Sequence, residues 1–234
     1  MMTKYYYGGD EVDGGWDRYF TLCNAIEVPW QADDRPSVKT LNSWRVQSPR
    51  GFAFVVQAQP IVVETILALS NRGATSFTAN FDEVWKATAD RARALGAKAI
   101  LIATPFDFAP GPANRTLMAD FGRKAREAAK MPILWEATGM WSPEDAAELA
   151  TSCGLTLLHD PFANFETDDI NVYGKGDAAL LVNERGGARR NFDTDEMESI
   201  FDATQSFNRV FILFRGRYKW RHAREFKALL DFRD

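Results

Sequence analysis

Three carboxylates fall at or near the ends of candidate strands, where acid–base chemistry is often placed. They are Glu27, Glu136 and Asp160. Glu136 and Asp160 belong to consecutive strands, which lie about 4.8 Å apart if they pair as neighbours. Two carboxylates at that distance can share a proton or a cation, or serve as general acid and base. We therefore predict catalytic roles for all three. The alternative is that each carboxylate only anchors a loop through hydrogen bonds or ion pairs.

Arginines gather in two short segments that follow the last two candidate strands. One segment reads Arg-Gly-Gly-Ala-Arg-Arg over residues 185–190, and the other reads Arg-Gly-Arg-Tyr-Lys-Trp-Arg over residues 215–221. In a barrel these loops are neighbours, and many barrels bind phosphate there. Arginine binds anions through two parallel hydrogen bonds. Salt bridges to nearby acids such as Glu184 and Asp193 are the alternative. The predicted ligand-binding residues are Arg185, Arg189, Arg215, Arg217 and, at the end of the third strand, Gln57.

Histidines and cysteines are too few to build most metal sites. The sequence holds two of each. We expect His159 to be a structural histidine and His222 to be solvated, and Cys23 and Cys153 to be reduced packing residues. A zinc site would need carboxylates as well, and a hard cation with oxygen ligands would fit more easily. Neither is supported, so we predict no metal site, and the sequence names no cofactor.

The composition is that of an ordinary globular protein. Hydrophobic residues make up 46% of the chain and charged residues 26%, with a net charge of -4. The negative charge argues against general nucleic-acid binding. No stretch approaches the roughly 18 apolar residues that a bilayer crossing needs, and the first residues lack the apolar core of a signal peptide. We expect a cytoplasmic protein that does not insert into membranes.

Short apolar runs alternate with helix-like segments along the whole chain. This alternation is typical of parallel α/β proteins, and continuously apolar strands indicate burial on both faces. We predict a TIM-like (β/α)8 barrel of parallel strands, formed as a single domain over residues 1–234; an open doubly wound sheet is the alternative. The eight expected strands are 5–8, 22–28, 52–58, 99–103, 133–137, 155–159, 179–183 and 210–214.

Several helix boundaries carry capping signals. Ser142 is expected to cap the N-terminus of a helix that Gly154 ends. Asp193 or Thr194 is expected to begin a helix through Met197, and residues 219–230 form the last helix. Residues 38–46 should form a short helix, and the connection over 164–177 should be irregular.

Some of these segments resemble a known family. After the strand with Glu27 come Leu41-Asn42-Ser43-Trp44 and then Ser48-Pro49-Arg50-Gly51-Phe52, and Leu134-Trp135-Glu136 is followed by Met140-Trp141. This order resembles the signature of the YecE-like family, also called domain of unknown function seventy-two. The resemblance implies a TIM-like barrel.

The departures from the family pattern fall on its polar positions. Gln57 stands where the family has Lys, Ile102 where it has Gln, and Ala137 where it has Arg. Pro29 replaces an Asn, and Arg215-Gly216 replaces a closing Asn pair. The resemblance therefore does not carry the family's chemistry over intact.

Two functional hypotheses stay open, and a third ranks below them. The first is a hydrolase-like enzyme acting on an anionic or phosphorylated small molecule or nucleotide. The second is a catalytically silent barrel used for binding or for assembly with a protein partner, which the lost polar positions favour. Direct nucleic-acid binding through the arginine-rich loops comes third, because the whole molecule is acidic.

Overall fold

A computed structural model describes residues 2–12, 14–30, 36–77, 80–162, 170–183 and 192–233 of the 234-residue chain. Parallel strands alternate with helices in the order of a (β/α)8 barrel, so the predicted fold class is confirmed. The elements fall into two compact units, and each is described by itself. The extent of the domain, residues 1–234, stays a prediction.

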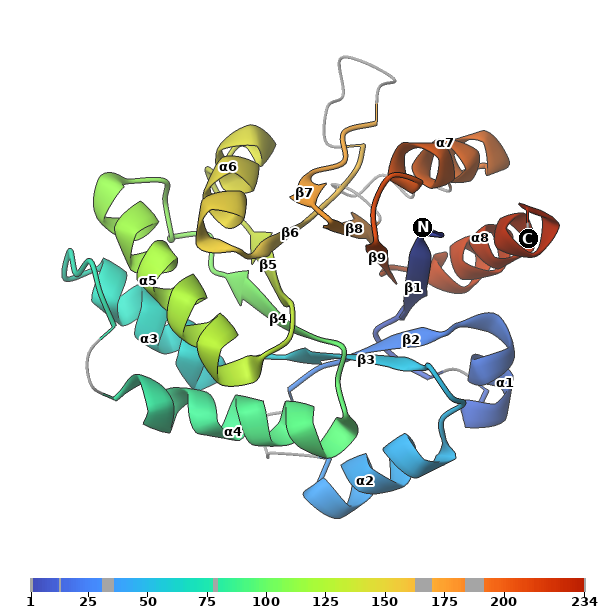
Figure 1. The fold of residues 1–234 in the computed structure, drawn as a ribbon, viewed down its shortest axis with the longest axis horizontal. Coiled ribbons are helices and arrows are strands. Elements are labelled where there is room, and N and C mark those ends of the chain that lie inside the picture. The colour runs from blue at the N-terminus through green and yellow to red at the C-terminus, as the bar shows by residue number, and fades with distance from the viewer. Residues whose placement is uncertain are drawn as a thin grey trace. The chain divides into compact units, whose positions relative to one another are not determined.

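The first unit joins the beginning of the chain to its end. It comprises Met1–Glu27, Pro49–Ala53 and His159–Asp234. In it, β1 (Lys4–Gly9) pairs in parallel with β9 (Arg209–Phe214), which pairs in parallel with β8 (Asp177–Val182). Figure 1 shows α8 (Lys219–Arg233), in red, beside the blue β1, and the two elements pack together. Residues far apart in the sequence therefore meet in this unit.

Two further helices and a short strand complete the first unit. They are α1 (Trp16–Leu22), α7 (Thr194–Thr204) and β7 (Gly174–Lys175). Both helices pack on α8, and β7 runs antiparallel to β8. All but one residue of β2 (Ala25–Val28) also lies here.

The second unit comprises Val28–Ser48 and Phe54–Leu158. Its strands β3 (Ala53–Gln57), β4 (Ala99–Thr104), β5 (Ile133–Ala137) and β6 (Thr156–His159) pair in parallel in this order. Only the first residue of β3 and the last of β6 belong to the other unit. The helices are α2 (Val38–Gln47), α3 (Pro60–Ser70), α4 (Phe81–Leu95), α5 (Pro112–Ala129) and α6 (Pro143–Cys153).

The predicted caps are present where they were expected. The Ser142 side chain accepts a hydrogen bond from the Asp145 amide at the start of α6, and Gly154 ends that helix with a φ of 68°. Asp193 forms a full capping box with Glu196 at the start of α7. These local hydrogen bonds and the left-handed glycine mark the helix ends.

Two predicted boundaries need correction. The second strand begins at Ala25 rather than Leu22, because Leu22 is the last residue of α1. The connection after β6 was expected to be irregular, yet Gly174 and Lys175 form β7 within it. A two-residue strand of Gly and Lys has no apolar pattern, so periodicity could not reveal it.

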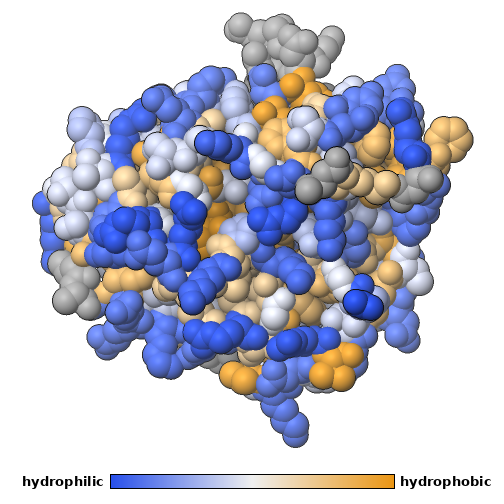
Figure 2. Space-filling view, viewed as in Figure 1, coloured by the Kyte–Doolittle hydropathy of each residue, from blue (hydrophilic) through white to orange (hydrophobic). Residues whose placement is uncertain are grey.

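The face of the molecule in Figure 2 is mostly hydrophilic, and its hydrophobic areas are small and separate. Among the described residues, no helix combines the length and the hydropathy needed to cross a bilayer.

Candidate functional site

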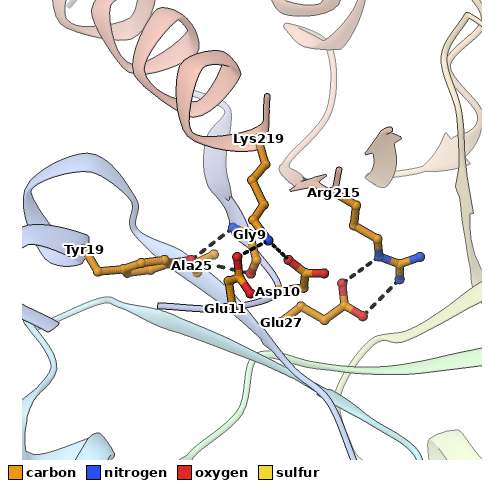
Figure 3. Close-up of polar contacts among 8 residues, drawn as sticks. All are labelled: Gly9, Asp10, Glu11, Tyr19, Ala25, Glu27, Arg215 and Lys219. Carbon is orange, nitrogen blue, oxygen red and sulfur yellow. Dashed lines mark hydrogen bonds and ion pairs between the residues drawn. The ribbon is translucent and has the colours of Figure 1, made fainter. Parts of the chain in front are cut away.

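A buried ion pair joins β2 to the residue that follows β9 (Figure 3). Arg215 donates from Nε to Oε2 of Glu27 and from Nη2 to Oε1, each over 3.0 Å. Only 1% of the Glu27 side chain and 19% of the Arg215 side chain are exposed. A bidentate arginine–carboxylate pair fixes the plane and direction of the guanidinium. Glu27 therefore positions Arg215 at the C-terminal ends of the strands.

A second charged group lies at the start of α8. Lys219 Nζ is 2.7 Å from a carboxylate oxygen of Asp10 and 2.7 Å from one of Glu11. Burial alone would lower the pKa of Lys219, but the hydrogen bonds to these two carboxylates raise it above its usual value. The ammonium is therefore charged at neutral pH. We call Asp10, Glu11, Glu27, Arg215 and Lys219 the rim cluster.

Side-chain hydrogen bonds from Tyr19 and Asn24 join β1 to β2. The Tyr19 hydroxyl donates to the Ala25 carbonyl over 2.7 Å and accepts from the Gly9 amide over 3.0 Å (Figure 3). Asn24 Oδ1 accepts from the Tyr7 amide over 2.8 Å. Tyr19 is buried, and burial raises its pKa well above the usual value. The hydroxyl thus keeps the proton that it donates to β2.

Gly8 allows the close approach of these two strands. A Cβ atom at this position would lie 1.8 Å from the Ala25 carbonyl oxygen and 2.7 Å from the Tyr19 hydroxyl. A backbone atom cannot move away without shifting β2, so any larger residue would separate the strands that carry Asp10 and Glu27.

The other predicted carboxylates lie in different units. Glu136 is the fourth residue of β5, half-buried, and in register with Ala103 and Leu158 in the second unit. Asp160 follows β6 in the first unit, where its Oδ1 accepts from the Phe162 amide over 2.8 Å. The catalytic roles of Glu136, Asp160 and Glu27 stay predictions.

The predicted ligand-binding residues are only partly described. Gln57 ends β3, is half-buried, and lies in register with Leu101. Arg217 is exposed. Arg185 and Arg189 lie outside the described residues. Ligand binding by these residues and by Arg215 stays a prediction.

One histidine lies as expected and the other does not. His159 Nε2 is 2.8 Å from the Asn171 carbonyl oxygen, which agrees with a structural role. The expectation that His222 is solvated is wrong: it is 1% exposed, and its Nε2 accepts from the Phe192 amide over 3.1 Å. The buried residues of α8 include positions 219, 222, 223 and 226, and this helical spacing in the sequence already places His222 on the apolar face.

Within the part of the chain that the structure describes, no group of three or more His, Cys, Asp or Glu side chains could hold a metal ion.

Comparison with solved structures identifies the fold. A DUF72 family protein from Thermotoga maritima superimposes with a TM-score of 0.65 at 14% identity, over 97% of this chain and 99% of that one. One from Enterococcus faecalis V583 gives 0.68 at 14% identity, over 97% and 98%. The chain has the DUF72 fold. The predicted resemblance to this family is thus confirmed at the level of the fold.

This chain also resembles other solved barrels, with lower TM-scores. A sugar phosphate isomerase/epimerase from Parabacteroides distasonis gives a TM-score of 0.53 at 11% identity, over 88% of this chain and 82% of that one. Neither a protein-family model nor a curated protein matches the sequence. One barrel fold hosts many chemistries, so function must be argued from the site.

Proposed function

We propose that this chain binds a small anionic molecule through Arg215 at the rim cluster. The observation that carries the proposal is the bidentate ion pair between Arg215 and the 1% exposed Glu27. Burying two charges costs several kcal/mol of desolvation per ion, so such a pair is weak evidence for stability alone. Its position at the C-terminal ends of strands, where barrels place their sites, supports a functional use.

The shape of the pair supports anion binding. A guanidinium carries five N–H donors in one plane, and Glu27 engages Nε and Nη2. Figure 3 shows Nη1 on the side away from Glu27. Glu27 therefore fixes the plane of the Arg215 guanidinium, the plane in which a carboxylate or phosphate would bond to it.

The charge of the cluster limits the ligand class. Asp10, Glu11 and Glu27 carry three negative charges, against two positive charges on Arg215 and Lys219. A highly charged anion such as a nucleoside triphosphate would meet repulsion from these carboxylates. We infer that the ligand carries a single carboxylate or phosphate group, and that nucleic acid is not the partner.

A hydrolase-like reaction on this ligand requires an acid–base residue outside the pair. Both carboxylate oxygens of Glu27 already accept hydrogen bonds from Arg215. Asp160, which lies in the same unit as Arg215, is our candidate. Because Arg215 holds Glu27, a second function is also favoured: a barrel that binds its ligand without catalysing a reaction.

A matched pair of variants tests the binding proposal. Arg209 forms the same two-pronged contact with Asp177 at the opposite end of β9. In titration calorimetry with inorganic phosphate and with acetate, Arg215→Met should weaken binding of at least one anion about tenfold or more, and Arg209→Met should leave it unchanged. Equal effects of the two variants, or none, would refute the proposal.

A further inference from the structure

An alanine near the C-terminal end of an otherwise buried strand is open to solvent. Ala103 of β4 is exposed, whereas Ile102 and Thr104 on either side are 0% and 1% exposed. In the parallel register Ala103 pairs with Glu136 of β5. Residues paired in register point to the same face of a sheet. The small side chain of Ala103 thus leaves accessible space beside the Glu136 carboxylate.

Two large apolar side chains are exposed to solvent just after the C-terminal ends of the same two strands. Phe106, which follows β4, is 69% exposed, and Met140, which follows β5, is 67% exposed. The two loops touch, since a Cβ atom on Gly139 would lie 2.3 Å from the Phe106 carbonyl oxygen. Single exposed apolar residues are common, but two on touching loops, one of which follows the strand that carries Glu136, suggest a binding surface.

These loops are held by internal hydrogen bonds. Trp141 donates to the Phe108 carbonyl over 2.6 Å, and Thr138 donates to the Thr104 carbonyl. Trp135 donates to the Thr104 hydroxyl over 3.1 Å. The exposure of the neighbouring Phe106 and Met140 is therefore built into an ordered part of the fold.

We propose that Ala103, Phe106, Glu136 and Met140 form a second binding site, which takes a primary amine on an apolar, ring-bearing body. A carboxylate offers about four acceptor positions, so Glu136 can receive an ammonium group alongside its protein partners. The Phe106 ring and the Met140 thioether supply apolar and polarizable contacts for the ring. This proposal does not rest on the anion site proposed at Arg215.

Benzylamine is a suitable probe, with benzyl alcohol as its uncharged counterpart. In NMR titrations of the full chain, benzylamine should bind saturably and benzyl alcohol about tenfold or more weakly. Glu136→Gln should weaken benzylamine binding by a similar factor, and Phe106→Ala by about threefold. Phe232→Ala, which removes an exposed ring at the end of α8, should change nothing.

The methyl signals of Ala103 and Met140 give a readout that does not depend on the variants. Benzylamine should shift both signals in the unaltered protein. Equal affinity for benzyl alcohol, undiminished binding by Glu136→Gln, shifts confined to other residues, or no saturable binding would each overturn the proposal.

Discussion

Arg209 and Arg215 hold carboxylates in the same way at the two ends of β9. Arg209 donates from Nε and Nη2 to Asp177 over 2.9 and 2.5 Å, and Arg215 donates from the same two nitrogens to Glu27 over 3.0 Å each. In barrels the N-terminal ends of the strands serve stability and the C-terminal ends carry the chemistry. The two arginines thus share one hydrogen-bond geometry. We expect Arg209 to serve stability and Arg215 to bind a ligand.

Removing Arg215 should destabilise the protein more than removing Arg209. Arg215→Met leaves the buried Glu27 carboxylate without its bidentate partner, at a cost of about 3 kcal/mol. Arg209 is more exposed, with 43% of its side chain accessible, so Arg209→Met should cost about 1 kcal/mol. Urea unfolding measures both. The double variant Glu27→Leu with Arg215→Met should recover most of the loss, and a loss for Arg215→Met no larger than that for Arg209→Met would contradict this account.

Tyr19→Phe should weaken the junction of β1 and β2. It removes the hydroxyl that bonds the Gly9 amide and the Ala25 carbonyl, and leaving buried backbone groups unsatisfied costs about 1–3 kcal/mol. Tyr6→Phe is the control, because the Tyr6 hydroxyl makes no hydrogen bond within the described residues and its ring stacks on Phe211. Equal melting temperatures for the two variants would count against a bridging role for Tyr19.

Gly8→Ala should be among the most damaging single-methyl changes in the chain. The added methyl group meets the Ala25 carbonyl oxygen at 1.8 Å, so β1 and β2 must separate. We expect a loss of about 3 kcal/mol or more, at the upper end of overpacking effects. Gly111→Ala has nothing within 4 Å of the new atom and should cost well under half as much. Thermal unfolding of both variants checks the contrast, and similar costs would disprove the steric argument.

Stability should fall at alkaline pH because of Cys23. Burial raises the pKa of this thiol from 9.0 to about 12. The unfolded chain therefore loses the proton first, and the stabilisation that is complete below pH 9 is lost as the pH rises towards 12. For one such group, the free energy of unfolding falls by up to about 1.4 kcal/mol per pH unit in this range. Between pH 9 and 10, Cys23→Ala should flatten the curve of unfolding free energy against pH; an unchanged slope would contradict the prediction.

The fold could be predicted from the sequence, and much of the site could not. Apolar runs and caps such as Ser142 and Asp193 are local signals, and they predicted most strands and helices close to their observed bounds. Glu27 pairs with Arg215 across 188 positions of sequence, and the sequence suggested such an ion pair only as the alternative to a catalytic role. Tyr19 was missed because its partners are backbone groups of Gly9 and Ala25, which leave no trace in residue types.

The acidic segment after β1 shows the same limit. Asp10 and Glu11 both form ion pairs with Lys219, which lies about two hundred positions later in the sequence. Only the pairing of β1 with β9 brings them to the start of α8. The ion pairs at the rim thus depend on which strands are neighbours, and the spacing of residues along the sequence does not predict them.

The most direct test of the anion site is a crystal structure of the protein soaked in tungstate, a phosphate analogue that scatters X-rays anomalously. The account predicts an anomalous peak within hydrogen-bonding distance of Arg215 Nη1, with the Glu27–Arg215 pair intact, and no peak in crystals of Arg215→Met. A peak at Arg209 instead of Arg215, or none at either arginine, would contradict the account.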